Sequence, residues 1–167
     1  MLCCLRIQQL AIIDESEIDF GLGLNILSGE TGSGKSILIH ALQLLLGGRA
    51  RVDMIRTGAE QAIVEALFEL EPGSSFLEHE AIGGNTELVI RRVVNLSGRS
   101  RAYVNGKLTT LSQLKEIAAG LVDISSQHEH HSLTQASAHL RYLDAYGGLE
   151  AQTRAVGHAV EKALESH

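Results

Sequence analysis

Alternating apolar and polar residues predict that the first part of this chain is built mainly from β-strands. Residues 62–70 alternate regularly, with Glu65 and Glu69 on the polar face, and this period of two is typical of a half-buried strand. Residues 88–94 predict a further strand. Residues 5–20, with β-forming runs at 5–7 and 11–13 and an alternating run at 15–20, predict two more.

A tight hairpin and a capped helix are predicted next. Two short runs, 101–104 and 107–109, flank Asn105-Gly106, a dipeptide that strongly favours a two-residue hairpin turn. Thr110, followed three residues later by Gln113, forms a capping box that predicts a helix ending near residue 120. Residues 121–124 predict a short buried strand.

One apolar helix is predicted earlier in the chain, between two glycine-rich turns. Residues 37–46 are mostly apolar and stop at Gly47-Gly48, which indicates a helix and its end. Residues 24–28 predict a short buried strand that enters the first turn. The turn itself is a complete G-x-x-x-x-G-K-S pattern, consisting of Gly29, Glu30, Thr31, Gly32, Ser33, Gly34, Lys35 and Ser36.

This pattern, set between a strand and a helix, predicts a phosphate-binding loop. Its glycines let the backbone curl until several N–H groups point at one phosphate. The ammonium of Lys35 can reach the β- and γ-phosphates of ATP, and the hydroxyl of Ser36 can ligate the Mg²⁺ that bridges them. The N-terminus of the following helix adds a partial positive charge. The sequence therefore predicts a site for a nucleoside triphosphate with magnesium.

Composition and charge add a few limits. The chain has 167 residues, of which 44% are hydrophobic and 20% charged, enough for one globular domain. No apolar run reaches the ~18 residues of a membrane helix, and the adjacent Cys3 and Cys4 favour a reducing, cytoplasmic setting. The net charge of −6 argues against coating nucleic acid by bulk electrostatics.

The C-terminal part is predicted to be helical. One helical segment runs from residue 133 to 146, and Gly147-Gly148 interrupts it. The last segment, 149–167, is polar with a narrow apolar stripe, which fits either the first turns of a partner-seeking coiled-coil helix or a frayed terminal helix.

Several stretches together resemble the ATPase head of the RecN family, the bacterial DNA-repair members of the SMC-like group of ABC-type ATPases. The resemblance extends over nearly all of residues 1–147. It rests on the segments 10–15, 23–32, 44–50, 98–106 and 127–130.

This resemblance implies an α/β fold, namely the N-terminal half of a P-loop NTPase head of the ABC/SMC type with an antiparallel β-layer. Residues 1–147 would form the half-head, and residues 148–167 would begin a coiled-coil helix. The family implies a cytoplasmic, nucleoid-associated ATPase that acts in double-strand-break repair and recombination. Its partners would be a complementary C-terminal head half, a second head in a homodimer, and DNA.

The family also implies two residue roles outside the loop. Gln127 would be the Q-loop glutamine, which helps to ligate Mg²⁺ and senses the γ-phosphate. Arg56 stands where SMC-like heads carry an arginine that can approach the nucleotide phosphates, although a surface arginine in a loop is the commoner case.

Some features depart from the family pattern. His40 replaces a usual aspartate, and Ser125-Ser126 replaces a usual His-Gly before the glutamine. We expect the chain to lack a Walker B aspartate, a catalytic glutamate and a Leu-Ser-Gly-Gly element, which in the family lie beyond the coiled coil. Such a fragment would bind ATP but hydrolyse it poorly by itself, whereas the complete protein would be an ATPase.

Other functions stay open on sequence alone. The chain could be a small P-loop phosphotransferase resembling a nucleotide kinase, or a structural P-loop module that does not hydrolyse its nucleotide. Residues 128–131 (His-Glu-His-His) could bind a metal, although their spacing does not fit a helical metal motif. The basic stretch 91–115 could contact DNA phosphates or form the solvated face of an edge hairpin.

Overall fold

The structure is a computed structural model that describes the whole chain except residues 31–33, 75–76, 78, 80–81, 120, 123, 127–128, 131–138, 141–142, 145 and 166–167. The chain divides into two compact units, Met1–Val122 and Asp123–His167. The boundary predicted between residues 147 and 148 stays a prediction.

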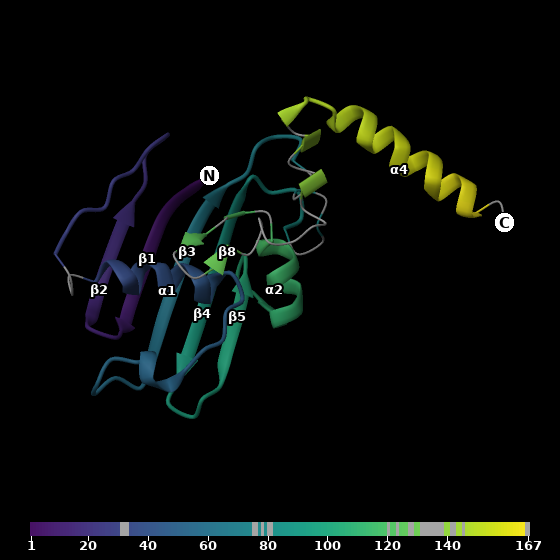
Figure 1. The fold of residues 1–167 in the computed structure, drawn as a ribbon. Helices are drawn as coiled ribbons and strands as arrows, with labels where there is room; N and C mark the ends of the chain where they lie inside the picture. The colour runs from purple at the N-terminus through teal and green to yellow at the C-terminus, as the bar shows by residue number, and fades with distance from the viewer. Residues whose placement is uncertain are drawn as a thin grey trace. The chain divides into compact units, whose positions relative to one another are not determined.

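The first unit is built on a six-stranded antiparallel sheet with the order β2-β1-β3-β4-β5-β6 (Figure 1). Each strand pairs with the next strand along the chain, except that β3 pairs with β1 and not with β2. The strands are β1 (Leu2–Leu10), β2 (Ile13–Asp19), β3 (Gln61–Glu69), β4 (Glu87–Asn95), β5 (Ser100–Val104) and β6 (Lys107–Thr109). The strands predicted at 62–70 and 88–94 are thus confirmed as β3 and β4.

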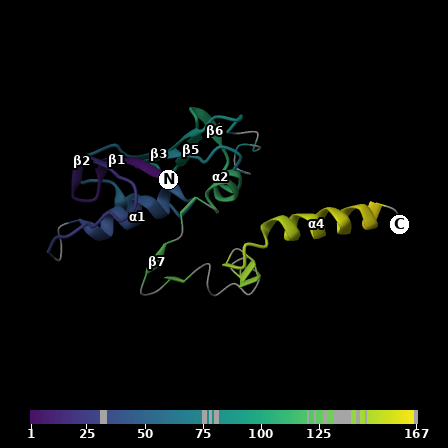
Figure 2. The same cartoon turned by 90° about the horizontal axis from the view of Figure 1, so that it is seen from above.

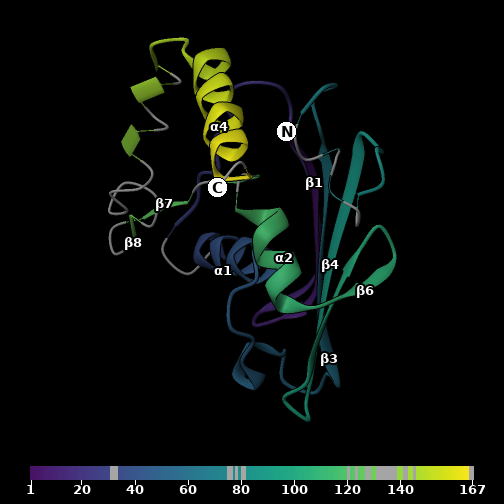
Figure 3. The same cartoon turned by 90° about the vertical axis from the view of Figure 1, so that its right-hand side faces the viewer.

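One face of this sheet is covered by two helices and forms the core. Helix α1 (Lys35–Leu45) packs on β3 and β4, and helix α2 (Leu111–Ala118) packs on β5. Figures 2 and 3 show both helices on the same side of the sheet. The buried side chains of this inner face are largely aliphatic and include Leu5, Ile7, Val64, Phe68, Leu88, Ile90, Val94 and Val104 from the strands, with Ala41, Leu44, Leu45, Leu114 and Ile117 from the helices.

Local signals of the predicted hairpin and helix are present in the structure. Asn105 and Gly106 both have positive φ, 47° and 78°, as the turn between β5 and β6 requires. At the start of α2, the backbone N–H of Gln113 donates to Thr110 Oγ1 at 3.3 Å, and the N–H of Thr110 donates to Gln113 Oε1 at 3.2 Å. The capping box is therefore confirmed.

Three strand predictions were wrong or misplaced. Residues 24–28 form no strand and are exposed, because no other described strand lies beside them to accept and donate backbone hydrogen bonds. Ala11 and Ile12 form the turn between β1 and β2 rather than part of a strand. The described residues among 121–124 are not in a strand, and the nearest strand is β7 (Ser125–Ser126).

The second unit contains a small antiparallel pair and one long helix. β7 pairs with β8 (Glu129–His130), and α4 runs from Glu150 to Glu165. The helical segment predicted after residue 148 is thus confirmed, and its apolar residues Val156 and Val160 are exposed. Within the described residues, none of the helices combines the length and the apolar character that crossing a membrane demands.

We predict that Thr110→Ala lowers the free energy of unfolding by about 1 kcal/mol, because the backbone N–H of Gln113 loses its acceptor, Thr110 Oγ1. Thr110→Ser, which keeps the hydroxyl, should unfold close to the wild type. Urea denaturation followed by circular dichroism measures both, and equal stability of the alanine and serine variants would contradict the assigned cap.

Candidate phosphate-binding site

The described part of the loop lies at the N-terminus of α1. Gly34 is the N-cap and adopts φ of 96°, a left-handed conformation that favours glycine. Its carbonyl accepts the first helical bonds, from Ile37 N at 2.9 Å and Leu38 N at 3.2 Å. The remaining N–H groups of the first turn have no partner within a helix, so this end of α1 suits an anion. Thr31, Gly32 and Ser33 lie outside the described residues.

The side chain of Lys35 folds back over the loop. Its ammonium donates to the carbonyl oxygen of Glu30 at 2.7 Å and also contacts the carbonyl of Gly29. The charge is thereby held at the carbonyls of the first two residues of the pattern, Gly29 and Glu30. Ser36, the predicted Mg²⁺ ligand, is exposed on the first turn of α1.

The chain that leads into the loop exposes large apolar side chains. Leu22, Leu24 and Ile26 are 88%, 87% and 80% exposed. The segment is nevertheless shaped locally, because the side chain of Asn25 accepts from Gly21 N at 3.0 Å and donates to the Gly21 carbonyl at 2.9 Å. Exposed aliphatic side chains gathered in one segment are typical of an interaction surface.

Arg56, predicted to approach the nucleotide, is half-buried and bonded to the backbone of another turn. Its Nη1 donates to the carbonyl of Ile12 at 2.8 Å, and its backbone N–H donates to Gln9 at 2.9 Å. These bonds fix the turn between β1 and β2 against the segment after η1 (Val52–Met54). The structure thus gives Arg56 a structural role at this turn, and its nucleotide role stays a prediction.

The predicted Q-loop glutamine, Gln127, lies outside the described residues, as do His128 and His131. The backbone of Glu129–His130 forms β8, and the metal alternative for this stretch stays untested. The magnesium role of Gln127 therefore remains an expectation from the resemblance.

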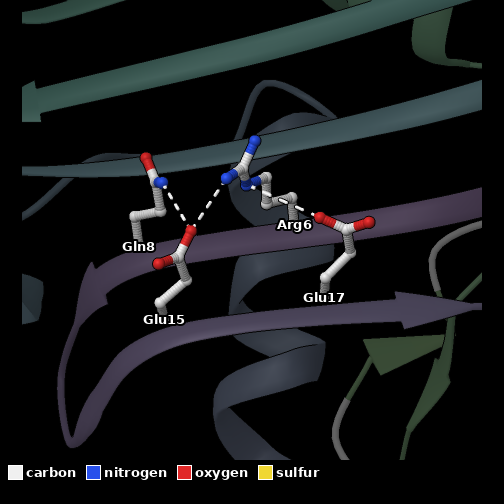
Figure 4. Close-up of polar contacts among 4 residues, drawn as sticks. All are labelled: Arg6, Gln8, Glu15 and Glu17. Atoms are coloured by element: carbon white, nitrogen blue, oxygen red, sulfur yellow. Dashed lines mark hydrogen bonds and ion pairs between the residues drawn. The ribbon is translucent and has the colours of Figure 1, made fainter.

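One stretch has the form expected of a Walker B motif, contrary to the prediction that the chain lacks one. Residues 10–15 (Leu-Ala-Ile-Ile-Asp-Glu) are four apolar residues followed by Asp-Glu. In the structure they form the β1–β2 turn and the start of the edge strand β2, with Asp14 and Glu15 exposed. Figure 4 shows Glu15 bonded instead to Arg6 Nη2 at 2.8 Å and Gln8 Nε2 at 3.0 Å. The pattern is present, but its carboxylates serve the surface of the sheet.

The basic stretch 91–115 divides between two faces of the sheet. Arg91 and Arg101 point to the outer face, where they line a groove of about 480 Å³ together with Tyr103 and Val93. Arg92 is fully buried on the inner face. The prediction that the basic stretch 91–115 could contact DNA is therefore wrong for Arg92, because a residue with no exposed surface cannot contact DNA.

Arg92 forms two hydrogen bonds in the core. Its Nη1 donates to the carbonyl of Leu44 at 3.0 Å, at the C-terminal end of α1, and its Nη2 donates to Ser100 Oγ on β5 at 2.6 Å. Burial lowers the pKa of Arg92 to about 10, so the guanidinium is charged at neutral pH.

A protein-family model described as "AAA domain" matches residues 4–165 of this chain. Among curated proteins, the DNA repair protein RecN of Halalkalibacterium halodurans is 45% identical over 157 residues, covering 92% of this chain and 28% of the relative. RecN of Bacillus subtilis is 41% identical, covering 92% of this chain and 27% of the relative. The chain thus spans less than a third of the length of these relatives.

Solved structures of SMC heads resemble the fold. The SMC head domain from Thermotoga maritima is 27% identical with a TM-score of 0.56, covering 69% of this chain and 41% of that one. A chain from work on ATP-driven dimerization and DNA-stimulated activation of SMC ATPases is 26% identical with a TM-score of 0.61, covering 85% of this chain and 90% of that one. The predicted α/β fold of an SMC-type P-loop head is confirmed.

We predict that Glu15 titrates below its ordinary range. The hydrogen bond from Arg6, then that from Gln8, and the charge of Arg6 lower the pKa of Glu15. A carboxyl whose pKa is lowered on folding stabilises the fold above its unfolded pKa, and this contribution disappears as the pH falls through the folded pKa. NMR titration of the Glu15 carboxyl should show the low pKa in the wild type and a rise in Arg6→Ala. An unchanged pKa in that variant would rule out this ion pair.

Proposed function

The chain belongs to the AAA domain family, among the RecN-like ATPase heads of the SMC type, and on this premise we propose that it is the ATP-binding half of a head that acts in DNA double-strand-break repair. ATP and Mg²⁺ bind at Gly29–Ser36. The Lys35 ammonium binds the β- and γ-phosphates, Ser36 ligates the metal, and Gln127 completes the γ-phosphate side.

The observation that carries this proposal is the position of Lys35 and Ser36 at the N-terminus of a helix packed on the sheet. The left-handed Gly34 turns the backbone into α1, so the N–H groups of the first turn and the helix dipole act on the same anion. The Lys35 ammonium already lies at the loop carbonyls of Gly29 and Glu30. When ATP binds, the Lys35 ammonium exchanges these carbonyl oxygens for phosphate oxygens.

A second part of the head completes the site. The exposed residues Leu22, Leu24 and Ile26 lead directly into the loop, and their backbone has no sheet partner among the described residues. A complementary C-terminal half that adds strands beside this segment would bury the apolar side chains and supply the Walker B carboxylates. A second head would close over the nucleotide, ATP would hold the pair together, and hydrolysis would open it.

The setting of this activity follows from the relatives. They are DNA repair proteins, and we infer that the complete protein acts on DNA in the cytoplasm, in association with the nucleoid. The outer groove carries Arg91 and Arg101, which could meet phosphates, together with Glu65, which lies 3.8 Å from Arg91 Nε. Arg92 is excluded by its burial.

We predict that the chain binds ATP-Mg²⁺ and that Lys35→Ala abolishes detectable binding, because the loop loses its only lysine ammonium. Turnover should appear only when a C-terminal head half is added. Calorimetry measures binding and phosphate release measures turnover. Hydrolysis or phosphotransfer by the chain alone at ordinary enzyme rates of ~1 per second or more would contradict the split site and favour the kinase-like alternative.

We predict that Ile26→Glu weakens association with the C-terminal half at least about tenfold, because a charge would have to be buried beside the new strands. Leu108→Glu is the matched control, since Leu108 is also an exposed aliphatic residue, 69% exposed, but lies on the edge strand β6. Calorimetric titration of each variant with the C-terminal half compares the two. Equal affinities would show that the segment before the loop is not the contact surface.

A further inference from the structure

Arg92 is the one charged side chain in the described core. It lies on β4, between Ile90 and Val94 on the inner face, and has no exposed surface. No described carboxylate forms an ion pair with it, and its Nε has no acceptor among the described residues. A buried charge with this environment is unfavourable unless some other feature compensates for its desolvation.

The compensating feature is the C-terminal end of α1. Leu44 is the penultimate residue of the helix, and its carbonyl accepts from Arg92 Nη1 at 3.0 Å and from Gly47 N at 3.2 Å. The carbonyl end of a helix carries partial negative charge, so a guanidinium at this point is favourable. Arg92 therefore serves as a cationic cap supplied by the sheet.

The same guanidinium also reaches the neighbouring strand. Its Nη2 donates to Ser100 Oγ on β5 at 2.6 Å. One planar group thus joins three elements, α1, β4 and β5, and its fork geometry fixes the direction of both bonds. A lysine could donate to the helix carbonyl but could not reproduce the fork.

The end of α1 is tightly fitted around this contact. Gly47 has φ of 88°, and a Cβ there would lie 2.5 Å from Lys115 Cγ of α2. A Cβ on Gly48 would lie 2.6 Å from the carbonyl oxygen of Gln43. A side chain at either glycine would have to displace one of these neighbours. Because α1 is a continuous hydrogen-bonded helix, a displacement of this end also moves the other end.

Stability alone is a weak reason for such a residue. Apolar replacements of buried charged groups are often neutral or stabilising, and the surrounding inner face is otherwise apolar. The alternative is a geometric role. The opposite end of α1 carries Lys35 and Ser36, so a small shift of the helix against the sheet displaces both residues from the phosphates.

We propose that Arg92 is a positioning residue for nucleotide binding: by holding the C-terminal end of α1 against β4 and β5, it sets where Lys35 and Ser36 meet the phosphates and magnesium. This inference rests on the proposed ATP site at Gly29–Ser36. Arg92 touches neither nucleotide nor metal and acts through the helix.

The test compares ATP-Mg²⁺ affinity and thermal stability in the full chain. Arg92→Met should weaken affinity about tenfold, in the range by which residues remote from a ligand alter its binding. Val94→Ala is the matched control, because Val94 is a buried neighbour on the same face of β4 and its truncation lowers stability without removing a bond to α1. It should leave affinity within about twofold of the wild type.

Two milder variants remain informative if Arg92→Met does not fold. Arg92→Lys should recover part of the affinity, since an ammonium can still reach the Leu44 carbonyl, and Ser100→Ala should weaken binding less than Arg92→Met. Hydrogen exchange at Ile37 and Leu38, the first bonded amides of α1, should speed up in the Arg92 variants and not in Val94→Ala.

The outcomes separate this inference from the proposed function. If the wild type binds ATP-Mg²⁺ and the Arg92 variants bind equally well, or lose affinity only in step with Val94→Ala at equal loss of stability, Arg92 is merely structural and the inference is wrong. If the wild type itself does not bind, the proposed site fails and the inference fails with it.

Discussion

The packing of α1 on the inner face of the antiparallel sheet is the interaction on which the rest of this structure depends. Ala41, Leu44 and Leu45 bury one side of the helix against β3 and β4, and burial of this kind is the dominant favourable term in folding. The helix begins at Lys35, so the last two residues of the loop pattern, Lys35 and Ser36, form its first turn. The packing of aliphatic side chains along α1 therefore decides where the Lys35 ammonium lies at the N-terminus of the helix.

The same helix faces two different environments at its two ends. At the C-terminus, Gly47, Gly48 and Arg92 fit closely around the last carbonyls. At the N-terminus, the loop follows an exposed apolar segment with no described sheet neighbour. The helix is thus fixed firmly by the antiparallel layer, whereas the segment that feeds the loop presents apolar surface for another part of the head. This asymmetry is what we expect of a nucleotide site shared between two pieces of protein.

Much of the antiparallel layer could be predicted from the sequence because its signals are local. The period of two in β3 and β4, the Asn105-Gly106 turn and the capping box at Thr110 need only neighbouring residues to act. The strand predicted at residues 24–28 is wrong for the opposite reason. A strand forms only beside a partner strand, and the sequence of the segment cannot show whether that partner is present.

The candidate site was predictable where a motif specifies backbone chemistry and less so where topology decides. Gly34, Lys35 and Ser36 lie at the start of α1, where the sequence predicts the helix after the loop, while their roles towards a nucleotide stay predictions. By contrast, Arg91 and Arg92 both interrupt otherwise apolar faces of β4, and alternation alone cannot tell which face is covered by helices. Residues 10–15 fit a Walker B pattern letter by letter, yet the turn at Ala11 and Ile12 places Asp14 and Glu15 on an exposed edge strand.

The most direct test of this account is an amide NMR titration of the chain with ATP-Mg²⁺, because it reports where the ligand sits without assuming any activity. We expect the largest shifts at Gly34, Lys35 and Ser36, with smaller ones along α1 towards Leu44. Shifts centred instead on the outer groove at Arg91, Arg101 and Tyr103, with the loop unchanged, would contradict it.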